Sequence, residues 1–359
     1  MLRVFESFSG YGSQSIALRN LGIEYKVVAI SEIDKYAIKA YEAIHGPANN
    51  LGDICKIDPN DIPDHDLFTY SFPCQDLSVA GKQAGLGKGT RSGLLYECEK
   101  IIEAKRPKYL LLENVKNLVG KKFKADFDKW LEYLEGLGYT NYWKVLNAKD
   151  YGVPQNRERV FVVSILGDHK PYKFADKIPL DKCIADILED EVDEKYYINK
   201  PFHLVNKGHQ AELDIKGQDC IKRAYSTDKI APTLTTMQGG MREPKILTSP
   251  CICASGGRNP DNPSDRTPGV PTEQRLEFNT KGISNTITTV QKDNYVMETT
   301  YRIRKLTPRE CFRLMGMRDD DIDKIQAAGI SNTQQYKMAG NSIVVDVLEA
   351  IFKNLFMEG

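Results

Sequence analysis

The sequence predicts an α/β protein with two domains: a doubly wound, Rossmann-like sheet and a second, smaller β-rich domain. Strand and helix patterns alternate from Met1 to Leu166. From about residue 171 to 302 helical periodicity fades and Gly, Pro, Asn, Asp and Thr separate short strand-like pieces, after which helical patterns return. We expect the first domain at residues 1–168, completed by 330–359, and the second domain at 169–329.

Five runs rich in β-branched and aromatic residues predict the strands of the first domain. They are Leu2–Phe5, Tyr25–Ile30, Asp66–Ser71, Tyr109–Leu112 and Val160–Ile165. Between them, we expect Asp34 to cap a helix that Gly46 ends, and Ser92 to cap a helix that ends before Pro107. This alternation is typical of a mostly parallel sheet.

Helical patterns and one repeat mark the rest of the chain. The stretch Thr307-Pro308-Arg309-Glu310 has the form of a capping box with proline at the first helical position. Ser342 is expected to start a last helix whose apolar stripe covers a sheet. The segment Ile230–Thr236 is similar to the later segment Ile283–Thr289, which predicts a duplicated hairpin in the smaller domain.

Composition limits the class of protein. Lys+Arg and Asp+Glu both count 49, so the net charge argues neither for nor against a nucleic-acid partner. No signal peptide and no apolar stretch of the roughly 20 residues that span a bilayer is visible, so we expect a cytoplasmic protein. Eight cysteines without paired spacing and five histidines without ligand spacing predict reduced thiols and no metal. Buried structural thiols are expected at Cys55, Cys98, Cys183, Cys220 and Cys311.

A glycine-rich turn, Phe8–Ser13, follows the first predicted strand and precedes a helix, where glycines let the backbone approach a ligand closely. Ser15 stands where a dinucleotide fingerprint needs glycine, so the turn suits a nucleoside without a pyrophosphate. Glu32, at the end of the second predicted strand, is placed to accept from both ribose hydroxyls, and Asp53 from an adenine amino group. The alternatives are a plain strand-to-helix turn and a plain loop acid.

A cysteine follows the third predicted strand, in Phe72-Pro73-Cys74-Gln75. Cys74 thus stands at the carboxyl end of a strand, where doubly wound sheets bind ligands, and a thiolate is a strong nucleophile. The alternative is a buried structural thiol. The next loop favours an exposed position because it has glycine at 81, 85, 87 and 89, and its basic residues could bind phosphates as it closes. Those basic residues are Lys82, Lys88 and Arg91.

An acid and two arginines lie at the ends of two other predicted strands. Glu113 follows the apolar run Tyr109–Leu112, where desolvation would raise the pKa of its carboxyl group. Gln155, Arg157 and Arg159 alternate along the chain and therefore share one face of the strand that begins there. The alternatives are an acid that caps a turn and two solvated arginines.

In this order, these motifs resemble the DNA (cytosine-5)-methyltransferase family of prokaryotes and phages. The resemblance covers roughly residues 1–166 and 301–359. The matching segments are Phe8-x-Gly10-x-Gly12, Pro73-Cys74-Gln75, Glu113-Asn114-Val115, Gln155-x-Arg157-x-Arg159, Arg304-x-Leu306-Thr307-Pro308-Arg309-Glu310 and Ala339-Gly340-Asn341-Ser342. Two positions depart from the family pattern: Ser13 stands where a second glycine is usual, and Ile33 where many members carry an aromatic residue.

The resemblance implies methyl transfer from S-adenosylmethionine, which leaves as S-adenosylhomocysteine, to carbon 5 of a cytosine rotated out of DNA. It implies that Cys74 adds to carbon 6, that Glu113 protonates or hydrogen-bonds ring nitrogen 3, and that Arg157 and Arg159 stabilise the base oxygen and the site. It implies cofactor contacts by Phe8, Gly10, Gly12, Glu32, Ile33, Asp53, Leu94, Asn341 and Ser342. It implies DNA contacts by Gln75, Ser78 and Arg91.

The region of about 170–300 is expected to read the DNA sequence through polar side chains. The candidates are Gln238, Arg242, Arg258, Arg266, Arg275 and Gln291. The resemblance further implies double-stranded DNA as partner, a monomer, no metal, no membrane, and a role in restriction-modification or phage protection.

Three other functions compete with this interpretation. An RNA cytosine-5 methyltransferase would share the chemistry, but the large size of the region between the matching segments favours DNA. A non-catalytic DNA-binding protein with a decayed fold is disfavoured by the intact Cys74, Glu113, Arg157 and Arg159. A thiol hydrolase needs a histidine base, and no histidine falls within a motif.

Overall fold

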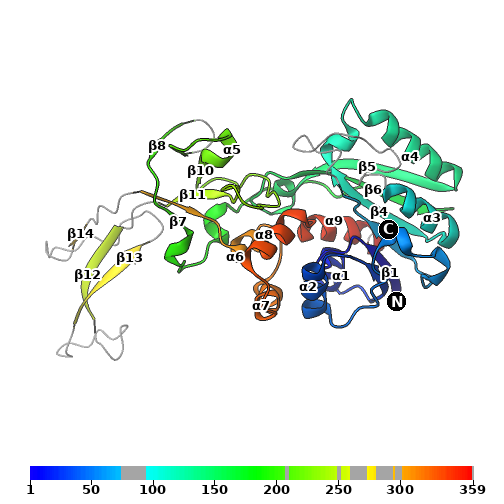
Figure 1. The fold of residues 1–359 in the computed structure, drawn as a ribbon, viewed down its shortest axis with the longest axis horizontal. Helices are drawn as coiled ribbons and strands as arrows, with labels where there is room; N and C mark the ends of the chain where they lie inside the picture. Colours follow the sequence, from blue (N-terminus) through cyan, green and yellow to red (C-terminus); the bar gives the residue numbers. More distant parts are fainter. Residues whose placement is uncertain are drawn as a thin grey trace. The chain divides into compact units, whose positions relative to one another are not determined.

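The structure is a computed structural model that describes residues 1–73, 94–206, 210–248 and 301–357 and, by their backbone, 252–258, 273–279 and 294–295. The chain divides into two compact units, each built from separate segments of the sequence. The first unit comprises residues 1–190, 228–243 and 307–359, and the second comprises 191–227 and 244–306. Figure 1 shows the elements of both units.

The first unit is built around a sheet of six strands in the described residues, in the order β2-β1-β3-β4-β6-β5. The strands are β1 (Leu2–Ser7), β2 (Tyr25–Ser31), β3 (Leu67–Tyr70), β4 (Tyr109–Val115), β5 (Tyr139–Asn147) and β6 (Glu158–Leu166). The pairs β1–β2, β1–β3 and β3–β4 are parallel, whereas β6 is antiparallel to both β4 and β5. The prediction of a mostly parallel α/β sheet is confirmed.

Helices α3 (Leu95–Lys105) and α4 (Lys124–Gly136) cover one face of this sheet. Strand residues that alternate along the chain, such as Phe68, Tyr70 and Leu110, share one apolar core with the buried side chains of these helices. The ring of Tyr70 meets Trp130 of α4 edge to face.

On the opposite face of β4, Tyr109 meets Phe356 of α9 (Val345–Phe356) with ring centroids 5.2 Å apart. Helix α1 (Ser13–Asn20) packs beside α9. Helix α2 (Lys35–His45) begins and ends as predicted, because the Asp34 carboxylate accepts from the Tyr36 N–H and Gly46 follows its last residue.

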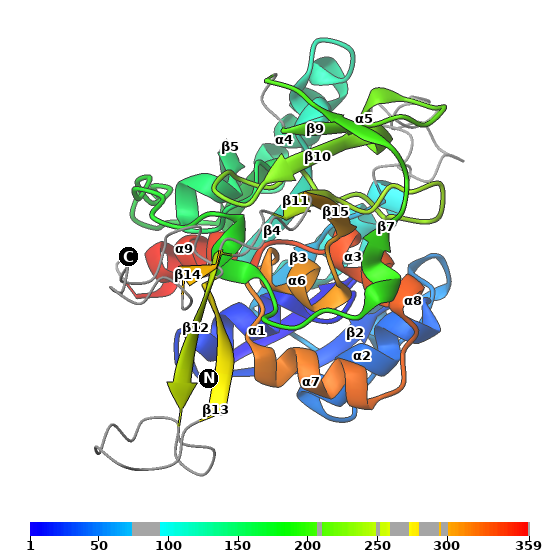
Figure 2. The same ribbon diagram turned by 90° about the vertical axis from the view of Figure 1, so that its left-hand side faces the viewer.

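The second unit is β-rich, as predicted, and several of its strands are labelled in Figure 2. Among the described residues, one sheet has the order β7-β15-β11-β10-β9-β8 and another the order β13-β12-β14. The first sheet contains β7 (Tyr197–Ile198), β8 (Phe202–Leu204), β9 (Ala211–Leu213), β10 (Arg223–Ser226), β11 (Lys245–Thr248) and β15 (Arg302–Lys305). The other contains β12 (Ile252–Arg258), β13 (Glu273–Asn279) and β14 (Asn294–Tyr295), and α5 (Asp219–Lys222) is a single turn.

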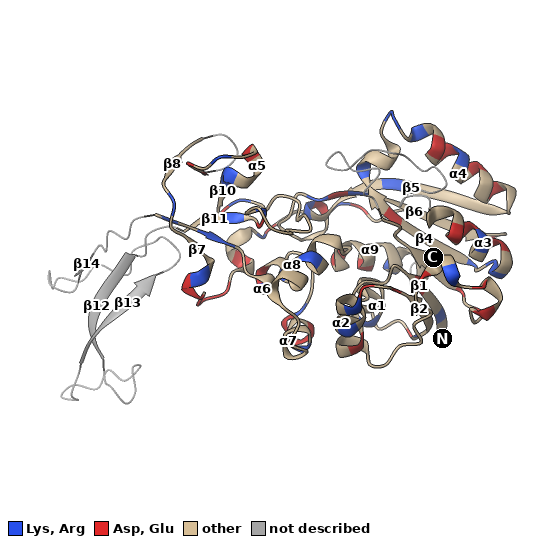
Figure 3. Ribbon diagram, in the orientation of Figure 1, with Lys and Arg blue, Asp and Glu red and all other residues tan. Residues whose placement is uncertain are grey.

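Charged residues of the first unit lie mainly on helices such as α3 and α4 and on loops, while its strands are mostly uncharged (Figure 3). This pattern fits a sheet whose two faces are both covered. Within the described ranges, no helix has the length and apolar character that a bilayer crossing requires.

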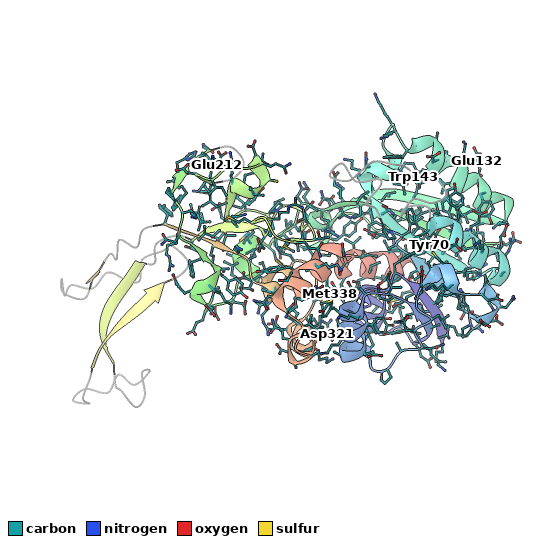
Figure 4. The ribbon with its side chains drawn as sticks, in the orientation of Figure 1. Tyr70, Glu132, Trp143, Glu212, Asp321 and Met338 are labelled. Carbon is teal, nitrogen blue, oxygen red and sulfur yellow. The ribbon has the colours of Figure 1, made fainter. Side chains whose placement is uncertain are left out.

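The chain returns to the first unit through α6 (Pro308–Arg313), α7 (Asp319–Ala327) and α8 (Asn332–Asn341), which α9 follows. The predicted capping box is confirmed: the Thr307 hydroxyl accepts from the Glu310 N–H, and the Glu310 carboxylate accepts from the Thr307 N–H. Asp321 of α7, marked in Figure 4, is fully buried and accepts from Arg19 of α1 and from Lys324. These contacts tie α7 to the N-terminal part of the unit.

Two predictions about local structure are wrong, and one strand was missed. Strand β5 was not expected, because polar residues such as Asn141 and Lys144 interrupt its apolar pattern; it is an edge strand, and edge strands expose such residues. The last helix begins at Val345, and Ser342 instead follows the end of α8. Ile230–Thr236 is not part of a hairpin, since Ala231 makes only an isolated bridge to Gln155 of the first unit.

The compact units also differ from the predicted domain boundaries. Residues 169–190, 228–243 and 307–329 lie in the first unit rather than the second. Cys98 and Cys311 are buried and Cys183 is half-buried, but Cys55 and Cys220 are exposed, which corrects their prediction as buried thiols. The second copy of the repeat, 283–289, and the cap residue Ser92 lie outside the described residues.

Segment 228–243 belongs to the first unit because α8 meets it backbone to backbone. A Cβ atom added at Gly340 would lie 1.9 Å from the carbonyl oxygen of Thr235 and 2.8 Å from the nitrogen of Thr236. Such contacts leave no room for a methyl group, so glycine is required at position 340 for close packing.

We therefore predict that Gly340→Ala lowers the free energy of unfolding by about 3 kcal/mol, at the upper end of the usual cost of overpacking, because the backbone around Thr235 must move. Urea denaturation followed by circular dichroism measures this loss. The matched control is Gly136→Ala at the end of α4, where an added Cβ meets nothing within 4 Å. It should be neutral or raise stability by about 0.5–1 kcal/mol. Equal effects of the two substitutions would contradict the close packing at Gly340.

Candidate active site

The carboxyl end of β4 lies beside the end of β3, from which the chain runs on toward Cys74. The side-chain amide of Asn114 donates to the carbonyl oxygen of Phe72 over 3.1 Å. The side chain of Ser71 lies near the Glu113 carboxyl group and lowers its pKa slightly. The backbone up to two residues before Cys74 is thereby fixed next to the acid that the sequence singled out.

Glu113 is buried at this sheet edge, with 8% of its surface exposed. Its Oε1 lies 3.2 Å from Nε of Arg159. Burial raises the pKa of the Glu113 carboxyl group, and this effect outweighs the nearby positive charges of Arg159 and Arg157, which lower it. Glu113 therefore keeps its proton to a higher pH than an exposed glutamate does, as its position after an apolar strand predicts.

Arg157 and Gln155 are buried and bind backbone groups. The alternative that Arg157 is a solvated arginine is therefore excluded. The guanidinium of Arg157 donates to the carbonyl oxygens of Leu234, Gly340 and Ser342 over 2.7–3.0 Å. The side-chain oxygen of Gln155 accepts from the Leu234 N–H over 3.2 Å. Arg157 thus holds three chain segments together, while its neighbour Arg159 pairs with the acid.

An open hollow of about 380 Å³ adjoins the ion pair between Glu113 and Arg159, since Arg159 forms part of its lining. Its walls come from the ends of β4 and β6, the turn before β6, and segment 228–243. The lining residues are Val115, Lys116, Asn117, Asn156, Glu158, Arg159 and Thr233. Most of these side chains are polar and several are donors, so the hollow suits a ligand with hydrogen-bond acceptors.

The glycine-rich turn after β1 has the backbone that a ligand site requires. Gly10 and Gly12 have φ angles of 58° and 82°, and Phe8 also has a positive φ of 53°. A non-glycine residue in the left-handed region is strained, and such strain is concentrated at functional sites. At Gly12 an added Cβ would also lie 2.5 Å from Nε2 of His45. Glycine is therefore needed at position 12 for both conformation and space.

Glu32 fixes this turn. Its Oε2 accepts from the Gly10 N–H over 3.0 Å, and its Oε1 accepts from the N–H groups of Ile33 and Asp34 over 2.8 Å. A carboxylate offers about four acceptor positions, so about one remains for a ligand. We therefore expect Glu32 to bind one ribose hydroxyl rather than two. Ile33 beside it is 72% exposed, which leaves an apolar surface for a ring.

The other expected cofactor residues surround the same sheet edge. Asp53 is half-buried and accepts from the Cys55 N–H over 3.1 Å, as the cap of a short 3₁₀ turn, Ile54–Lys56. Leu94 packs partly buried against the core before α3. Asn341 is exposed at the end of α8, and the Ser342 hydroxyl donates to the carbonyl oxygen of Met338 over 2.6 Å.

A family model described as C-5 cytosine-specific DNA methylase matches residues 2–357 of the chain. The chain belongs to this family. It is a DNA (cytosine-5) methyltransferase, hereafter the methylase. It is 39% identical to the type II methyltransferase M2.ScrFI of Lactococcus lactis subsp. cremoris, with 99% of each chain covered. It is 36% identical to the orphan methyltransferase M.SPBetaI of Bacillus phage SPbeta, with 99% of this chain and 97% of the relative covered.

Solved structures share the fold of the methylase. The S. pombe Dnmt2 methyltransferase superposes with a TM-score of 0.67 at 20% identity, covering 100% of this chain and 99% of that one. The Entamoeba histolytica methyltransferase EhMeth superposes with a TM-score of 0.65 at 17% identity, covering 100% and 98%. At such identities the likeness concerns the fold alone.

Several expected site residues of the methylase lie outside the described residues: Cys74, Gln75, Ser78 and Arg91, together with Arg266 and Gln291. Gln238 and Arg242 lie in the first compact unit rather than the second, which corrects their assignment to the middle domain. Arg258 and Arg275 lie on β12 and β13. In the part of the chain that the structure describes, no group of three or more His, Cys, Asp or Glu could hold a metal ion.

The structure also shows groups that sequence reasoning missed. Asn114 was quoted only as part of a motif, yet it binds the strand end that leads to Cys74. Thr233 was assigned to a repeat, yet it lines the hollow beside Arg159. Glu6 in the middle of β1 carried no motif at all. A carboxylate inside an otherwise apolar strand is the signal that could have identified it, because a buried ionisable group is usually paired with another polar group.

Glu6 is fully buried beneath the glycine-rich turn and accepts from the hydroxyl of Ser15 over 2.8 Å. Ser15 is the residue that replaces the third glycine of a dinucleotide fingerprint, and its carbonyl oxygen accepts from the hydroxyl of Tyr25. Burial raises the pKa of Glu6 to about 7. The carboxyl group is thus neutral at low pH and becomes a buried charge as the pH rises.

We predict that Glu6 makes the methylase less stable as the pH rises from about 4.5 to above 7. The pKa of Glu6 is higher in the folded than in the unfolded protein, so the protonated carboxyl group stabilises the fold at pH values below the unfolded pKa. This stabilisation is lost as the pH rises through the folded pKa. The loss is about 3 kcal/mol for a shift of this size. Urea denaturation between pH 5 and 8 should show Glu6→Gln gaining stability relative to the wild type by roughly that amount. Parallel stability curves for the two proteins would contradict the raised pKa.

Proposed function

We propose that the methylase attacks carbon 6 of an extruded cytosine with the thiolate of Cys74 while Glu113 holds a proton at ring nitrogen 3. The new carbon–sulfur bond pushes electron density to carbon 5, which makes that carbon nucleophilic. S-adenosylmethionine, when bound, would supply an electrophilic methyl group there and leave as S-adenosylhomocysteine. A water molecule then takes the proton from carbon 5, the electron pair restores the bond between carbons 5 and 6, and the bond to Cys74 breaks.

One observation carries this proposal: the strand end that leads to Cys74 is bonded to the residues around Glu113. Asn114, the residue after Glu113, donates to the carbonyl oxygen of Phe72 over 3.1 Å, and the side chain of Ser71 lies near the Glu113 carboxyl group. Two residues of chain span at most about 7 Å, so position 74 starts from a point within reach of the acid. A nucleophile and an acid that must act on one pyrimidine ring have to converge in this way.

The electrostatics of the site support the role of Glu113. Because burial raises its pKa, Glu113 keeps its proton to a higher pH than an exposed glutamate does, which favours donation to ring nitrogen 3. Arg159, 3.2 Å from the carboxylate, can stabilise the charge left behind and donate to the base oxygen. Arg157 is held by three carbonyl groups, so we assign it a positioning role rather than contact with the base.

The reacting atoms of cytosine are stacked and paired within a duplex, so the base must leave the helix before reaction. The hollow next to Arg159 provides space of about 380 Å³ at the mouth of the site. We therefore take double-stranded DNA as the substrate and the first compact unit as the part that receives the extruded nucleotide. Labelling of transfer RNA but not of duplex DNA with tritiated methyl groups would contradict this.

The residues around the glycine-rich turn fit S-adenosylmethionine. An added Cβ at Gly10 would meet nothing within 4 Å, so a ligand has room beside its backbone; Glu32 retains about one acceptor position for a ribose hydroxyl, and exposed Ile33 can cover an adenine ring. Asp53 would accept from the adenine amino group. Phe8, Gly10, Leu94, Asn341 and Ser342 complete the proposed cofactor site.

The second compact unit is proposed to read the sequence around the target cytosine. A two-stranded β-ribbon such as β12–β13 fits the width of a major groove, and arginine is the usual reader of guanine. Relatives of the methylase carry the names of type II and orphan phage methyltransferases. We therefore propose a monomeric enzyme that acts in the cytoplasm of a bacterium, in restriction-modification or in protection of phage DNA.

For Cys74→Ser we predict a loss of methyl transfer of at least about 10³-fold, because a hydroxyl is a far weaker nucleophile at neutral pH. Binding of DNA and of S-adenosylmethionine should persist. Tritiated methyl transfer and trapping on a duplex with 5-fluorocytosine, seen as a covalent adduct on a denaturing gel, measure the effect. Cys220→Ser, which alters an exposed thiol, is the matched control and should form the adduct. An adduct with Cys74→Ser would overturn the assignment.

For Glu113→Gln we predict a fall in kcat of about 10²–10⁴-fold with little change in DNA affinity, since a positioned proton donor contributes about that much. Single-turnover methylation and fluorescence anisotropy separate the two effects. Glu132→Gln, an exposed acid on α4 that Figure 4 labels, removes the same charge and should keep wild-type activity. If both variants lose activity equally, the loss reflects net charge rather than a proton at Glu113.

A further inference from the structure

A basic segment follows β4 directly, at residues 116–124. It carries four lysines within nine residues, and no acidic residue occurs from Asn114 to Ala125. The lysines are Lys116, Lys121, Lys122 and Lys124. The local excess is notable because the chain as a whole has equal numbers of basic and acidic residues. Figure 3 shows basic positions where the chain enters α4.

The fold holds this segment in one conformation. Leu118 and Phe123 are buried in the core of the first unit, with 1% and 2% of their surface exposed. Between these two anchors the chain turns at Gly120, whose N–H donates to the carbonyl oxygen of Asn117 over 2.9 Å. An added Cβ at Gly120 would lie 2.9–3.0 Å from atoms of Asn117, so the turn is tight. The exposed lysines between the anchors are thus presented on a fixed turn.

The lysines at the two ends of the segment have acidic partners that hold them weakly. Nζ of Lys116 lies 3.0 Å from both carboxylate oxygens of Glu158, and Lys124 pairs with Asp128. These side chains are 39–57% exposed. Ion pairs this exposed contribute little and exchange readily for another anion. Lys121 and Lys122 stand on the exposed turn, with the ammonium of Lys122 over the ring of Phe123.

The segment starts at the wall of the proposed active site. Lys116 and Asn117 line the hollow that Arg159 also lines, and Glu113 lies three residues before Lys116 in sequence. A phosphodiester backbone whose base occupies this site must continue past the hollow on one side or the other. Fixed positive charges at that place complement one negative charge per phosphate.

We propose that the basic segment, through Lys121 and Lys122 in particular, binds the phosphodiester backbone of duplex DNA next to the extruded cytosine. This inference rests on the proposed active site, since it needs the target base to enter beside Glu113. The contact is independent of sequence and supplies affinity and register rather than chemistry. It holds the duplex while pairing and stacking of the target base are broken.

The test is the double variant Lys121→Ala/Lys122→Ala, measured with the full-length methylase and a fluorescent duplex. Each phosphate contact makes the negative slope of log Kobs against log salt steeper by about 0.9. Loss of two contacts should therefore make the slope shallower by about 1.8. At about 0.1 M salt, relative to about 1 M, the same slope change corresponds to a loss of affinity of roughly 60-fold. The KM for DNA should rise in parallel, while kcat at saturating DNA stays within about twofold, because the substituted side chains do not touch the reacting atoms.

Two controls make the result specific. Lys26→Ala/Lys170→Ala removes two exposed lysines at the amino edge of the same sheet, since Lys26 lies at the start of β2 and Lys170 follows the antiparallel β6. It changes the net charge equally and should leave the salt slope unchanged. Lys121→Arg/Lys122→Arg keeps the charges and should keep the wild-type slope, because arginine also binds phosphate.

The proposed DNA contact is wrong if Lys121→Ala/Lys122→Ala keeps the wild-type salt slope. It is also wrong if Lys26→Ala/Lys170→Ala changes the salt slope by the same amount. A fall in kcat without a change in slope overturns it as well, because the lysines would then act through the fold. Each of these outcomes is distinguishable from failure of the proposed active site, which would appear as an adduct with Cys74→Ser.

Discussion

The first unit depends on the buried guanidinium group of Arg157. The chain leaves this unit and returns to it, so its site is assembled from segments that lie far apart in sequence. Arg157 binds carbonyl groups of Leu234, in the short segment between the two parts of the second unit, and of Gly340 and Ser342, at the end of α8. Hydrogen bonds from a charged donor to buried acceptors are strong, and the loss of such a partner leaves several groups unsatisfied. One side chain thus joins the acid side of the site to the proposed cofactor side.

Two buried glutamates in this unit have different surroundings, and these surroundings favour the different roles that we propose for them. Glu6 lies beneath the glycine-rich turn and has a neutral donor, Ser15, so burial dominates and raises its pKa to about 7. Glu113 lies at the sheet edge with Arg159 beside it, so the positive charge opposes part of the effect of burial. A carboxyl group that shares its surroundings with a cation can lose and regain a proton at modest cost. Glu113 suits proton transfer for this reason, whereas Glu6 suits the support of the turn.

Much of the first unit could be predicted from the sequence because its strands are buried on both faces and read as continuous apolar runs. Five of its six strands in the described residues were found in this way, and Asp34 and Thr307 marked helix starts correctly, because capping is a local interaction. The exposed edge strand β5 was missed, since its alternating polar residues carry a weaker pattern. Burial at the carboxyl end of β4 was likewise predictable for Glu113, because it follows directly from the preceding residues.

The sequence did not predict which segments belong to which compact unit. Nothing local distinguishes Ile230–Thr236 from a strand of a β domain; its place in the first unit comes from long-range contacts such as Thr235 against Gly340. For the same reason Gln238 and Arg242 were assigned to the wrong part of the molecule. Arg157 was interpreted by its face on a strand, but its partners Leu234 and Gly340 belong to distant segments of the chain. Tertiary hydrogen bonds of this kind have no periodic signature.

The division of the second unit into two inserts, 191–227 and 244–306, has a consequence for how specificity can change in evolution or by design. Transplanting this module from one relative to another involves four junctions instead of two. The residues of 228–243 must stay with the host, since they carry carbonyl groups that its own core binds. A chimera cut only at 190 and 306 would bring the relative's own version of 228–243 into that core. Successful exchanges should therefore keep the host's segment 228–243 and graft the two inserts separately.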